Sequence, residues 1–376
     1  MSGAPRQGLT SGSVPGWSSR AAPVAPYVVG VLPGEGIGPE VIDAALRVLD
    51  AAADAYGLTF EVRRAGDLGS GAYGSRLTDD VGAFFASTFA AGGPVLCGPA
   101  GGRFVYELRA RFDLYCKLVP VRPSPALADA SILRPDRLAG IDVVVVRENI
   151  GGLYQGSYAR GDGGRTASQS LTYTADQVDR VMQISARLAR ARRGRLTVVG
   201  KSGGIPEVSA LWWERAEAAG AAFHVSTEAL EVDNAGFQLV AEGARFDVVV
   251  APNMLGDVVA DTATLVLGSR GMAFSANVGD DGTGVYQTGH GAAYDIAGTD
   301  RANPVAMILS LAMLLRESLW LPEAATSVED AVETVLADGY RTPDIAAPGS
   351  QVVGTGGLAS RIADSLAPAG ARHSVA

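Results

Sequence analysis

Short apolar runs alternate with longer amphipathic segments along most of the chain. Apolar runs occupy residues 27–32, 94–98, 141–149, 195–201 and 246–252. Segments with apolar residues at helical spacing occupy 40–57, 175–193 and 211–220. Runs that are apolar nearly throughout are typical of strands covered on both faces of a parallel sheet. The alternation of such strands with helices predicts an α/β sheet protein.

Two stretches depart from this alternation. Residues 155–172 are polar and rich in glycine, which indicates either an arm or a flexible loop. Residues 304–319 form a strongly apolar helix that is either buried or placed at a subunit interface. The ends of the chain, 1–26 and 367–376, are rich in small and polar residues, and we expect them to be disordered tails.

Composition narrows the class of protein. A chain of 376 residues predicts one large domain or two interleaved ones. The net charge of −9, without a basic stripe, argues against nucleic acid as a partner. No apolar run reaches the roughly 18 residues of a membrane helix. The chain has only two cysteines, which suits the reducing cytoplasm.

Aspartates at helical spacing are the first candidates for chemistry. Asp257 and Asp261 lie four residues apart between apolar flanks, so a helix places both carboxylates on one face. A divalent cation with oxygen ligands would relieve their repulsion, whereas the plainer interpretation is a solvated helix face. Asp233, in the segment EVDNAGFQL, is either a helix cap or a third metal ligand.

Several cationic residues are candidates for binding an anionic substrate. Arg147 follows four valines at the end of a buried strand, where an arginine without a purpose would be costly. Arg109 and Lys117 lie in a second basic segment, and arginine suits bidentate carboxylate binding. Lys201 ends another strand and is a candidate base, the alternative being a surface lysine. His290 lies in a Gly-rich loop, which is either a structural turn or a cofactor-binding loop.

Taken together, these segments resemble the β-decarboxylating dehydrogenases, a family that includes isocitrate, 3-isopropylmalate, homoisocitrate and tartrate dehydrogenases. The resemblance covers about residues 27–366. Its blocks, in the family's order, are GEGIGPEV, LRARFDLYCKLVPVR, VVVVRENIGGLYQG, VVGK, EVDNAGFQLV, NMLGDVVAD, SANVGD, GHGAAYDIAG and ANPVAMILSLAMLLR. The block GEGIGPEV alone would be weak, since it lacks the G-x-G-x-x-G spacing of the common dinucleotide fold.

The resemblance implies an isopropylmalate-dehydrogenase-like fold with two subdomains around a large mixed sheet. Residues 27–114 plus 268–366 would form the large, cofactor-binding subdomain. Residues 115–267 would form an inserted small subdomain that carries the arm and the dimer interface. The protein would be a cytoplasmic homodimer whose active sites are shared between the subunits.

The family's functional residues transfer to this chain as expectations. Asp257 and Asp261 match metal ligands of one subunit, while Lys201 and Asp233 match a catalytic lysine and a third metal ligand donated by the partner. Tyr154 matches the catalytic tyrosine, and Arg109 and Arg147 match two of three arginines that bind substrate carboxylates. The adenosine site of NAD would comprise His290, Gly291, Ala292, Asp295, Ile296 and Asn303.

The chemistry that the resemblance implies is an NAD-dependent oxidation of a malate-like 2-hydroxy acid followed by loss of CO₂. Mg²⁺ or Mn²⁺ would chelate the substrate and lower the pKa of its hydroxyl. Lys201, with Asp233, would help to remove the hydroxyl proton, and Tyr154 would protonate the carbon that loses CO₂. Asp295 falls where an acidic residue favours NAD over NADP.

The chain also departs from the family. The third arginine is replaced by Val119, the neighbouring asparagine by Lys117, and Ser202-Gly203-Gly204 follows the catalytic lysine. Arg103 lies in the segment that recognises the substrate's variable group, either turned to solvent or paired with an anionic tail such as a carboxylate or phosphonate. We therefore expect a specialised relative, of secondary metabolism, for which 3-isopropylmalate and isocitrate are poor substrates.

Two rival functions remain at this stage. The chain could oxidise a tartrate- or malate-type hydroxy acid without releasing CO₂, which a product assay would distinguish. It could also be a catalytically silent subunit of a hetero-oligomer. The silent subunit is the weaker alternative, because all three aspartates, Tyr154 and Lys201 are present.

Overall fold

A computed structural model describes residues 22–366. The predicted disordered tails therefore lie outside the described residues, apart from 22–26. The strands are β1 Tyr27–Leu32, β2 Phe60–Arg64, β3 Gly69–Gly71, β4 Gly74–Arg76, β5 Val95–Cys97, β6 Cys116–Val121, β7 Val143–Glu148, β8 Tyr158–Gly161, β9 Thr166–Gln169, β10 Arg195–Gly200, β11 Ser226–Glu231, β12 Val248–Ala251, β13 Phe274–Val278, β14 Gly284–Thr288, β15 Tyr340–Arg341 and β16 Gln351–Val352. The helices are α1 Gly38–Tyr56, α2 Asp79–Ala90, α3 Phe104–Arg111, α4 Pro135–Leu138, α5 Ala175–Ala191, α6 Pro206–Phe223, α7 Val232–Ala241, α8 Asn253–Ala263, α9 Val305–Glu317, α10 Pro322–Ala337 and α11 Thr355–Asp364.

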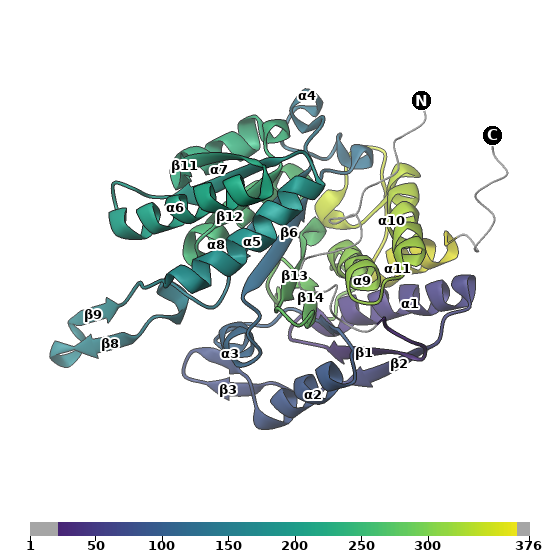
Figure 1. Cartoon of the computed structure of the whole chain (residues 1–376). Coiled ribbons are helices and arrows are strands. Elements are labelled where there is room, and N and C mark those ends of the chain that lie inside the picture. Colours follow the sequence, from purple (N-terminus) through teal and green to yellow (C-terminus); the bar gives the residue numbers. More distant parts are fainter. Residues whose placement is uncertain (1–21, 367–376) are drawn as a thin grey trace.

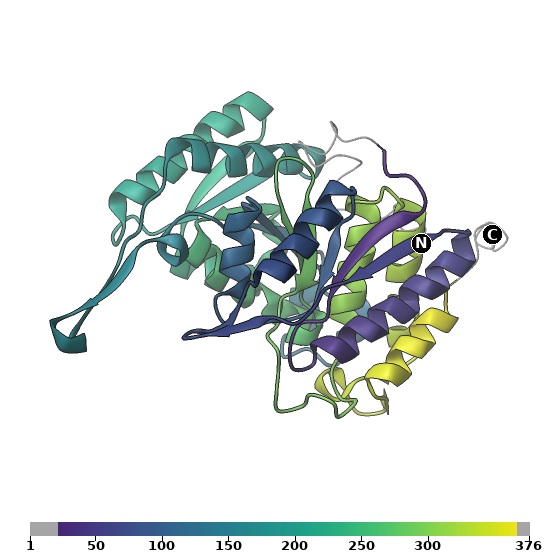
Figure 2. The same ribbon diagram turned by 90° about the horizontal axis from the view of Figure 1, so that it is seen from below.

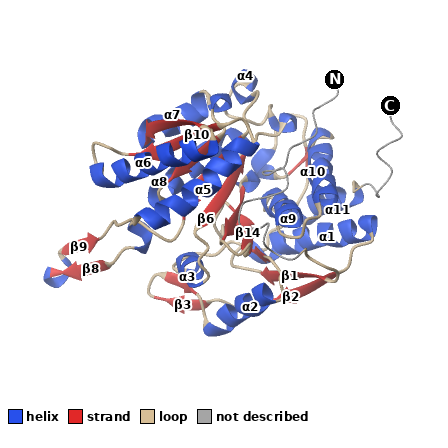
Figure 3. Ribbon diagram, in the orientation of Figure 1, coloured by secondary structure: helices blue, strands red, loops and turns tan. Residues whose placement is uncertain are grey.

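A ten-stranded mixed sheet runs through the molecule in the order β11-β10-β12-β7-β6-β13-β14-β5-β1-β2. The strands are parallel at both ends of the sheet, as the apolar runs predicted. In the middle, β6 is antiparallel to both β7 and β13, and β13 is antiparallel to β14. Helices flank the sheet on both sides (Figure 3). The α/β class and the large mixed sheet are thus as expected.

The two ends of the sheet carry different helices (Figure 1). At the β11 end, α5 and α6 pack together, as do α7 and α8, and both pairs contact the strands. At the β1 end, α1 lies beside α11 and α9 beside α10, which both views show (Figure 2). One large apolar core runs through both ends, and a second, smaller cluster of buried apolar residues lies around α2 and β5. The subdomain boundaries expected at 114/115 and 267/268 therefore stay a prediction.

The two stretches that departed from the alternation each have a defined structure. Strands β8 and β9 form an antiparallel hairpin whose residues are all exposed, and it projects from the body as an arm in Figures 1 and 2. The apolar helix α9 is buried within the chain itself. The junction GEGIGPE is a strand–loop–helix turn, because β1 ends at Leu32 and α1 begins at Gly38.

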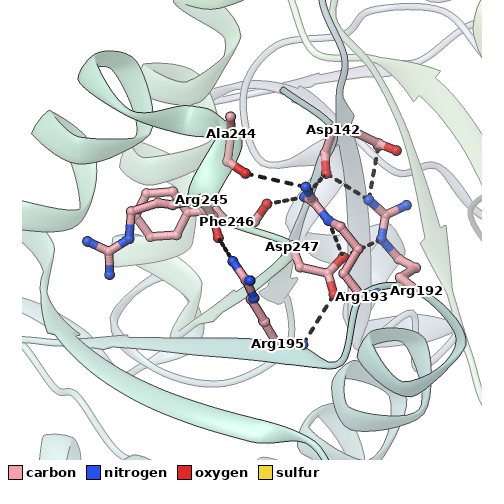
Figure 4. Close-up of polar contacts among 8 residues, drawn as sticks. All are labelled: Asp142, Arg192, Arg193, Arg195, Ala244, Arg245, Phe246 and Asp247. Carbon is pink, nitrogen blue, oxygen red and sulfur yellow. Dashed lines mark hydrogen bonds and ion pairs between the residues drawn. The ribbon is translucent and has the colours of Figure 1, made fainter. Parts of the chain in front are cut away.

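A buried carboxylate clamps the starts of three neighbouring strands (Figure 4). Asp247, which is fully buried just before β12, accepts hydrogen bonds from Arg192 Nε at 2.8 Å and from the backbone amides of Arg193 at 2.9 Å and Arg195 at 3.3 Å. Arg192 also binds Asp142 at 2.9 Å, just before β7. These hydrogen bonds join the residues at the starts of β7, β10 and β12 to one another. The opposite ends of the same strands carry candidate site residues.

Candidate active site

The carboxyl ends of β7, β10 and β12 meet at one edge of the sheet, where α/β proteins bind ligands. Strand β6 runs the other way, so its first residues lie at this same edge. Lys117, near the start of β6, pairs directly with Arg147, near the end of β7. Two basic segments that are 30 residues apart in the sequence thus meet side by side.

Arg147 is almost completely buried, at 2% exposure. Its Nε and Nη2 donate to Oδ1 of Asn253 at 3.1 and 2.8 Å, and its Nη1 pairs with Asp257. Asn253 in turn donates to the carbonyl of Gly151 at 3.0 Å. A Cβ at Gly256 would lie 3.0 Å from the Arg147 side chain, so the glycine permits α8 to lie against the arginine.

Helix α8 presents its two aspartates about one turn apart, as the sequence predicted. Asp257 accepts hydrogen bonds from Arg147 and, at 3.2 Å, from the hydroxyl of Tyr154. Asp261 pairs with Arg270. Both carboxylates are about half exposed and turned toward cationic groups. The face is therefore a polar site rather than a purely solvated surface.

The aspartates of α8 are candidate metal ligands of this chain. Two carboxylates on one helical face are hard oxygen donors of the kind that Mg²⁺ and Mn²⁺ prefer. Within residues 22–366 of one chain, however, no three aspartate, glutamate, histidine or cysteine side chains converge into a metal-binding group. A single chain thus offers two of the three expected ligands.

Lys201 and Asp233 form a separate, exposed pair. Their Nζ and Oδ1 atoms are 3.0 Å apart, and this hydrogen bond raises the pKa of Lys201 and lowers that of Asp233. Glu231, which sequence reasoning missed, lies 3.7 Å from Nζ and accepts from Ser202. Among the described residues, neither Lys201 nor Asp233 contacts the carboxylate of Asp257.

Two further cations lie beside Arg147, and neither has an ion-pair partner within residues 22–366. Arg109 is 4% exposed, and its Nε has no hydrogen-bond partner among the described residues. Burial, and next the charge of Arg147, lowers the pKa of Arg109 to about 9, so the guanidinium stays charged at neutral pH. Burial, followed by the charges of Arg109 and Arg147, lowers the pKa of Lys117 to about 7.

Tyr154 joins the arginines to an aromatic cluster. Its ring meets that of Tyr106 edge-on at 5.5 Å, and the guanidinium of Arg147 lies 5.5 Å from its centre. Burial, and next the charge of Asp257, raises the pKa of Tyr154 to about 12, so the phenol keeps its proton at neutral pH. Sequence reasoning missed Tyr106, although it lies three residues before Arg109 and so on the same face of a helix.

Val119 and Lys117 share one side of β6, being two residues apart on a strand. Val119 is only 3% exposed and pairs with Val145 in the apolar core. Lys117, by contrast, lies close enough to Asp257 and Asp261 for their charges to act on its ammonium. The cation next to the site is therefore Lys117, two residues from the position of the missing arginine.

The expected cofactor loop packs against the GEGIG turn. The amide of Ile37 donates to the carbonyl of Ala292 at 2.8 Å, and a Cβ on Gly36 would lie 1.9 Å from that oxygen. Gly291 and Asp295 are exposed, and Ile296 is half-buried. This contact between two motifs 250 residues apart was not predicted from the sequence.

Polar groups of this loop fit a nucleotide in part. The buried Nε2 of His290 has no hydrogen-bond partner among residues 22–366. Asn303 is buried and already engaged, because it donates to Asp344 at 3.1 Å and accepts from the amide of Val305 at 3.0 Å. Burial lowers the pKa of His290, and the charge of Arg270, which pairs with Asp261, lowers it further.

A family model described as isocitrate/isopropylmalate dehydrogenase matches residues 28–362. The chain belongs to this family. It is 40% identical over 346 residues to a 3-isopropylmalate dehydrogenase of Gloeobacter violaceus, a match that covers 87% of this chain and 95% of the relative. The family and the enzyme class expected from the sequence, a dehydrogenase acting on a hydroxy acid, are thus confirmed.

Further relatives agree. A 3-isopropylmalate dehydrogenase of Halalkalibacterium halodurans is 38% identical, covering 90% of this chain and 97% of the relative. The crystal structure of isocitrate dehydrogenase from Methylococcus capsulatus has a TM-score of 0.79 and 29% identity, covering 90% of this chain and 99% of that one. No helix in the described part of the chain is long and apolar enough to cross a membrane.

Proposed function

We propose that this dehydrogenase oxidises and decarboxylates a 3-substituted malate with NAD and Mg²⁺ or Mn²⁺. The observation that carries the proposal is the convergence of Arg109, Lys117 and Arg147 with the phenol of Tyr154 beside the carboxylates of α8. Cations at this spacing suit the two carboxylates of a malate core. The carboxylates of Asp257 and Asp261 suit a divalent cation.

The protein groups supply binding and proton transfer. When bound, the cation provides a Lewis acid beside the substrate hydroxyl, and NAD provides the hydride acceptor. Arg109 and Arg147 hold the carboxylates. Lys201 receives the hydroxyl proton; because Asp233 raises its pKa in the single chain, Lys201 becomes a base only when Asp233 is engaged elsewhere. Tyr154, protonated at neutral pH, donates a proton to the carbon that loses CO₂.

The working form would be a homodimer with shared sites. The Lys201–Asp233 pair is exposed and, among the described residues, makes no hydrogen bond or ion pair with Asp257 or Asp261, which supports its donation to the site of a second copy. Helices α7 and α8, which pack together, expose the large apolar side chains Phe237 and Val258, 72% and 56% exposed. The exposed arm, β8 and β9, offers a further surface for the partner.

The proposed cofactor is NAD rather than NADP. Asp295 is exposed on the loop that carries His290, where a carboxylate can accept hydrogen bonds from ribose hydroxyls and would repel a 2′-phosphate. We further propose that the enzyme works in the cytoplasm, since both of its cysteines are free thiols.

Turnover tests this function directly. The purified chain is incubated with NAD, Mn²⁺ and a series of 3-substituted malates, and NADH absorbance and released CO₂ are measured together. Equal amounts of NADH and CO₂ are expected. NADH without CO₂ would identify a non-decarboxylating oxidation instead, and no NADH with any malate would refute the proposal.

Subunit complementation tests the shared site. Lys201→Ala and Asp257→Asn chains are each expected to be inactive as homodimers. A mixed dimer should regain up to about half the activity of a wild-type dimer, because one of its two sites then has a full set of residues. The Arg111→Met chain serves as a control partner, because Arg111 pairs with Asp79 and not with a candidate site residue. Heterodimers that form without any recovery would exclude sites shared in this way.

A further inference from the structure

One carboxylate joins three separate segments of the chain beside the expected cofactor loop. Glu35, in the turn between β1 and α1, accepts hydrogen bonds from the hydroxyl of Ser75 at 2.5 Å, from the backbone amide of Gly101 at 3.0 Å and from the hydroxyl of Tyr294 at 3.0 Å. The three donors belong to β4, to the loop before α3 and to the expected cofactor loop. Glu35 therefore connects segments that are up to 259 residues apart in the sequence.

The expected cofactor loop contains a residue in an unfavourable backbone conformation. Ala293 has a φ of +41°, in the left-handed region where the Cβ of an ordinary residue is crowded by the backbone. An alanine stays in that region only when contacts on either side hold it there. The carbonyl before it, of Ala292, accepts from the amide of Ile37 at 2.8 Å, and the side chain after it, of Tyr294, binds Glu35. Both tethers run to the GEGIG turn, and the second depends on the tyrosine hydroxyl alone.

The tether acts next to the residue that is proposed to bind the ribose. Tyr294 is 66% exposed, so its ring contributes little to the core. Asp295 follows it directly, and the direction of the Asp295 carboxylate depends on the backbone of residues 293–296. This turn is closed by a hydrogen bond from the amide of Ile296 to the carbonyl of Ala293 at 3.1 Å. The hydroxyl of Tyr294 thus helps to set how Asp295 faces the cofactor.

The same carboxylate also reaches the substrate side of the site. Gly101 lies in the loop that leads into α3, the helix that carries candidate substrate-binding residues. Arg103, just before α3, is half-buried and donates from Nη1 to the carbonyl of Tyr154 at 3.3 Å, so it is not simply turned to solvent. Loss of the Glu35 carboxylate would free both this loop and the cofactor loop, whereas loss of the Tyr294 hydroxyl would free the cofactor loop alone.

We propose that Glu35 and Tyr294 are positioning residues for NAD, because their hydrogen bond holds the cofactor loop in the conformation that binds the dinucleotide. This inference rests on the proposed function, specifically on NAD as the ligand of this loop. The measured dissociation constant rises as the fraction of molecules in the binding conformation falls. The hydrogen bond therefore strengthens cofactor binding and leaves the chemical step unchanged.

Direct binding of NADH tests the tether without any substrate. Dissociation constants are measured by calorimetry for the wild type, Tyr294→Phe, Glu35→Ala and the double variant. Tyr294→Phe keeps the aromatic ring but loses the hydroxyl, and its Kd should rise at least about threefold. Glu35→Ala should raise Kd by at least as much. The double variant should bind NADH no more weakly than Glu35→Ala, because the hydroxyl has already lost its acceptor in that variant.

Glu35→Gln provides the rescue, and an exposed tyrosine elsewhere provides the control. An amide oxygen in the place of Oε2 can still accept from Gly101 and Tyr294, and the amide NH₂ can donate to the Ser75 hydroxyl, so Kd should stay within about twofold of the wild-type value. Tyr73 is 67% exposed, and its hydroxyl makes no hydrogen bond among residues 22–366. Tyr73→Phe should therefore leave Kd unchanged.

Steady-state kinetics give a second readout. Tyr294→Phe should raise KM for NAD at unchanged kcat, and Glu35→Ala should raise KM for the hydroxy acid as well, since it also frees the loop before α3. A fall in kcat of Tyr294→Phe at unchanged KM would place the hydroxyl in the chemical step and overturn its positioning role.

The outcomes separate this inference from the proposed function. A wild-type Kd in Tyr294→Phe, additive losses in the double variant, or equal losses in Glu35→Gln and Glu35→Ala would overturn the tether, while NAD-dependent turnover of a malate would still stand. The expected changes in NADH binding without turnover of any malate would support the tether although the proposed reaction fails. No binding of NADH by the wild type would refute both.

Discussion

Asn253 provides a sharp test of how the site is built, because its side chain holds a buried arginine in place. Its Oδ1 accepts two hydrogen bonds from Arg147, at 3.1 and 2.8 Å, and its amide donates to the Gly151 carbonyl at 3.0 Å. Asn253 is fully buried, so water cannot readily replace these contacts in Asn253→Ala. The substitution leaves two donors of a charged group and one carbonyl without partners.

The magnitude follows from those contacts. A hydrogen bond to a charged group contributes roughly 1.5–3 kcal/mol, and a buried unsatisfied polar group costs roughly 1–3 kcal/mol. Because the lost contacts share one side chain, they do not add fully, and we expect Asn253→Ala to lower the free energy of unfolding by about 3 kcal/mol. Arg147 would also lose its fixed orientation, and a loss of kcat/KM of about 10- to 100-fold, or roughly 1.4–2.8 kcal/mol, should follow.

Tyr173→Phe separates the two effects. The Tyr173 hydroxyl accepts from the backbone amide of Asn253 at 2.8 Å and, among the described residues, makes no hydrogen bond with Arg147. Its loss should lower stability, by roughly 1–2 kcal/mol, and change kcat/KM little. Denaturant unfolding and steady-state kinetics on the three proteins provide the comparison. If Asn253→Ala had wild-type kcat/KM, or if both variants lost activity in proportion to stability, Asn253 would not be orienting Arg147.

Two further outcomes test the proposed cofactors. EDTA should abolish turnover and Mn²⁺ or Mg²⁺ should restore it, while Asp257→Asn should fold but lose activity by orders of magnitude; full turnover in metal-free buffer would contradict this. NAD should be preferred over NADP by at least roughly tenfold in kcat/KM, about 1.4 kcal/mol, and Asp295→Ala should lower that preference. Equal use of both cofactors by the wild type would show that Asp295 does not select NAD.

The regular elements at the two ends of the sheet were predictable because their sequences are locally consistent. Runs such as 143–146, apolar at every position, have one good solution, a strand covered on both faces. The middle of the sheet was not predictable in the same way. Strand β6 is also mostly apolar, yet its antiparallel direction depends on the route of the chain from α3, which no local pattern encodes.

Some residues of the candidate site were likewise predictable from the sequence, and others were not. Spacing alone placed Asp257 and Asp261 on one helical face, and the end of a buried strand indicated Arg147. Asn253 and Arg270 contact those residues only after folding, across 106 and 9 residues respectively, and neither has a local signature. Tyr106 was within reach of sequence reasoning through its helical spacing from Arg109, had the aromatic been weighed as part of the site.

Two positions of β6 differ in charge from the family pattern. Family resemblance places an asparagine and an arginine where this chain has Lys117 and Val119. Val119→Arg alone should be harmful, because residue 119 is 3% exposed in the core and its guanidinium would have to extend about 7 Å along the strand toward Lys117. There it would add a further cation beside Lys117, Arg109 and Arg147, and like charges at about 5 Å repel by roughly 3 kcal/mol at an effective dielectric constant of 20. Removing the lysine removes its share of that repulsion.

The double variant Lys117→Asn/Val119→Arg should therefore be more stable and more active than Val119→Arg alone, with a coupling free energy of at least roughly 1 kcal/mol. Unfolding free energies and kcat/KM for the wild type, both single variants and the double variant give that coupling. Lys117→Asn alone should raise KM for every malate, since it removes a cation next to the malate core. If the two changes were additive, Lys117 and residue 119 would not act on the same group, and the lysine could not be a replacement for the missing arginine.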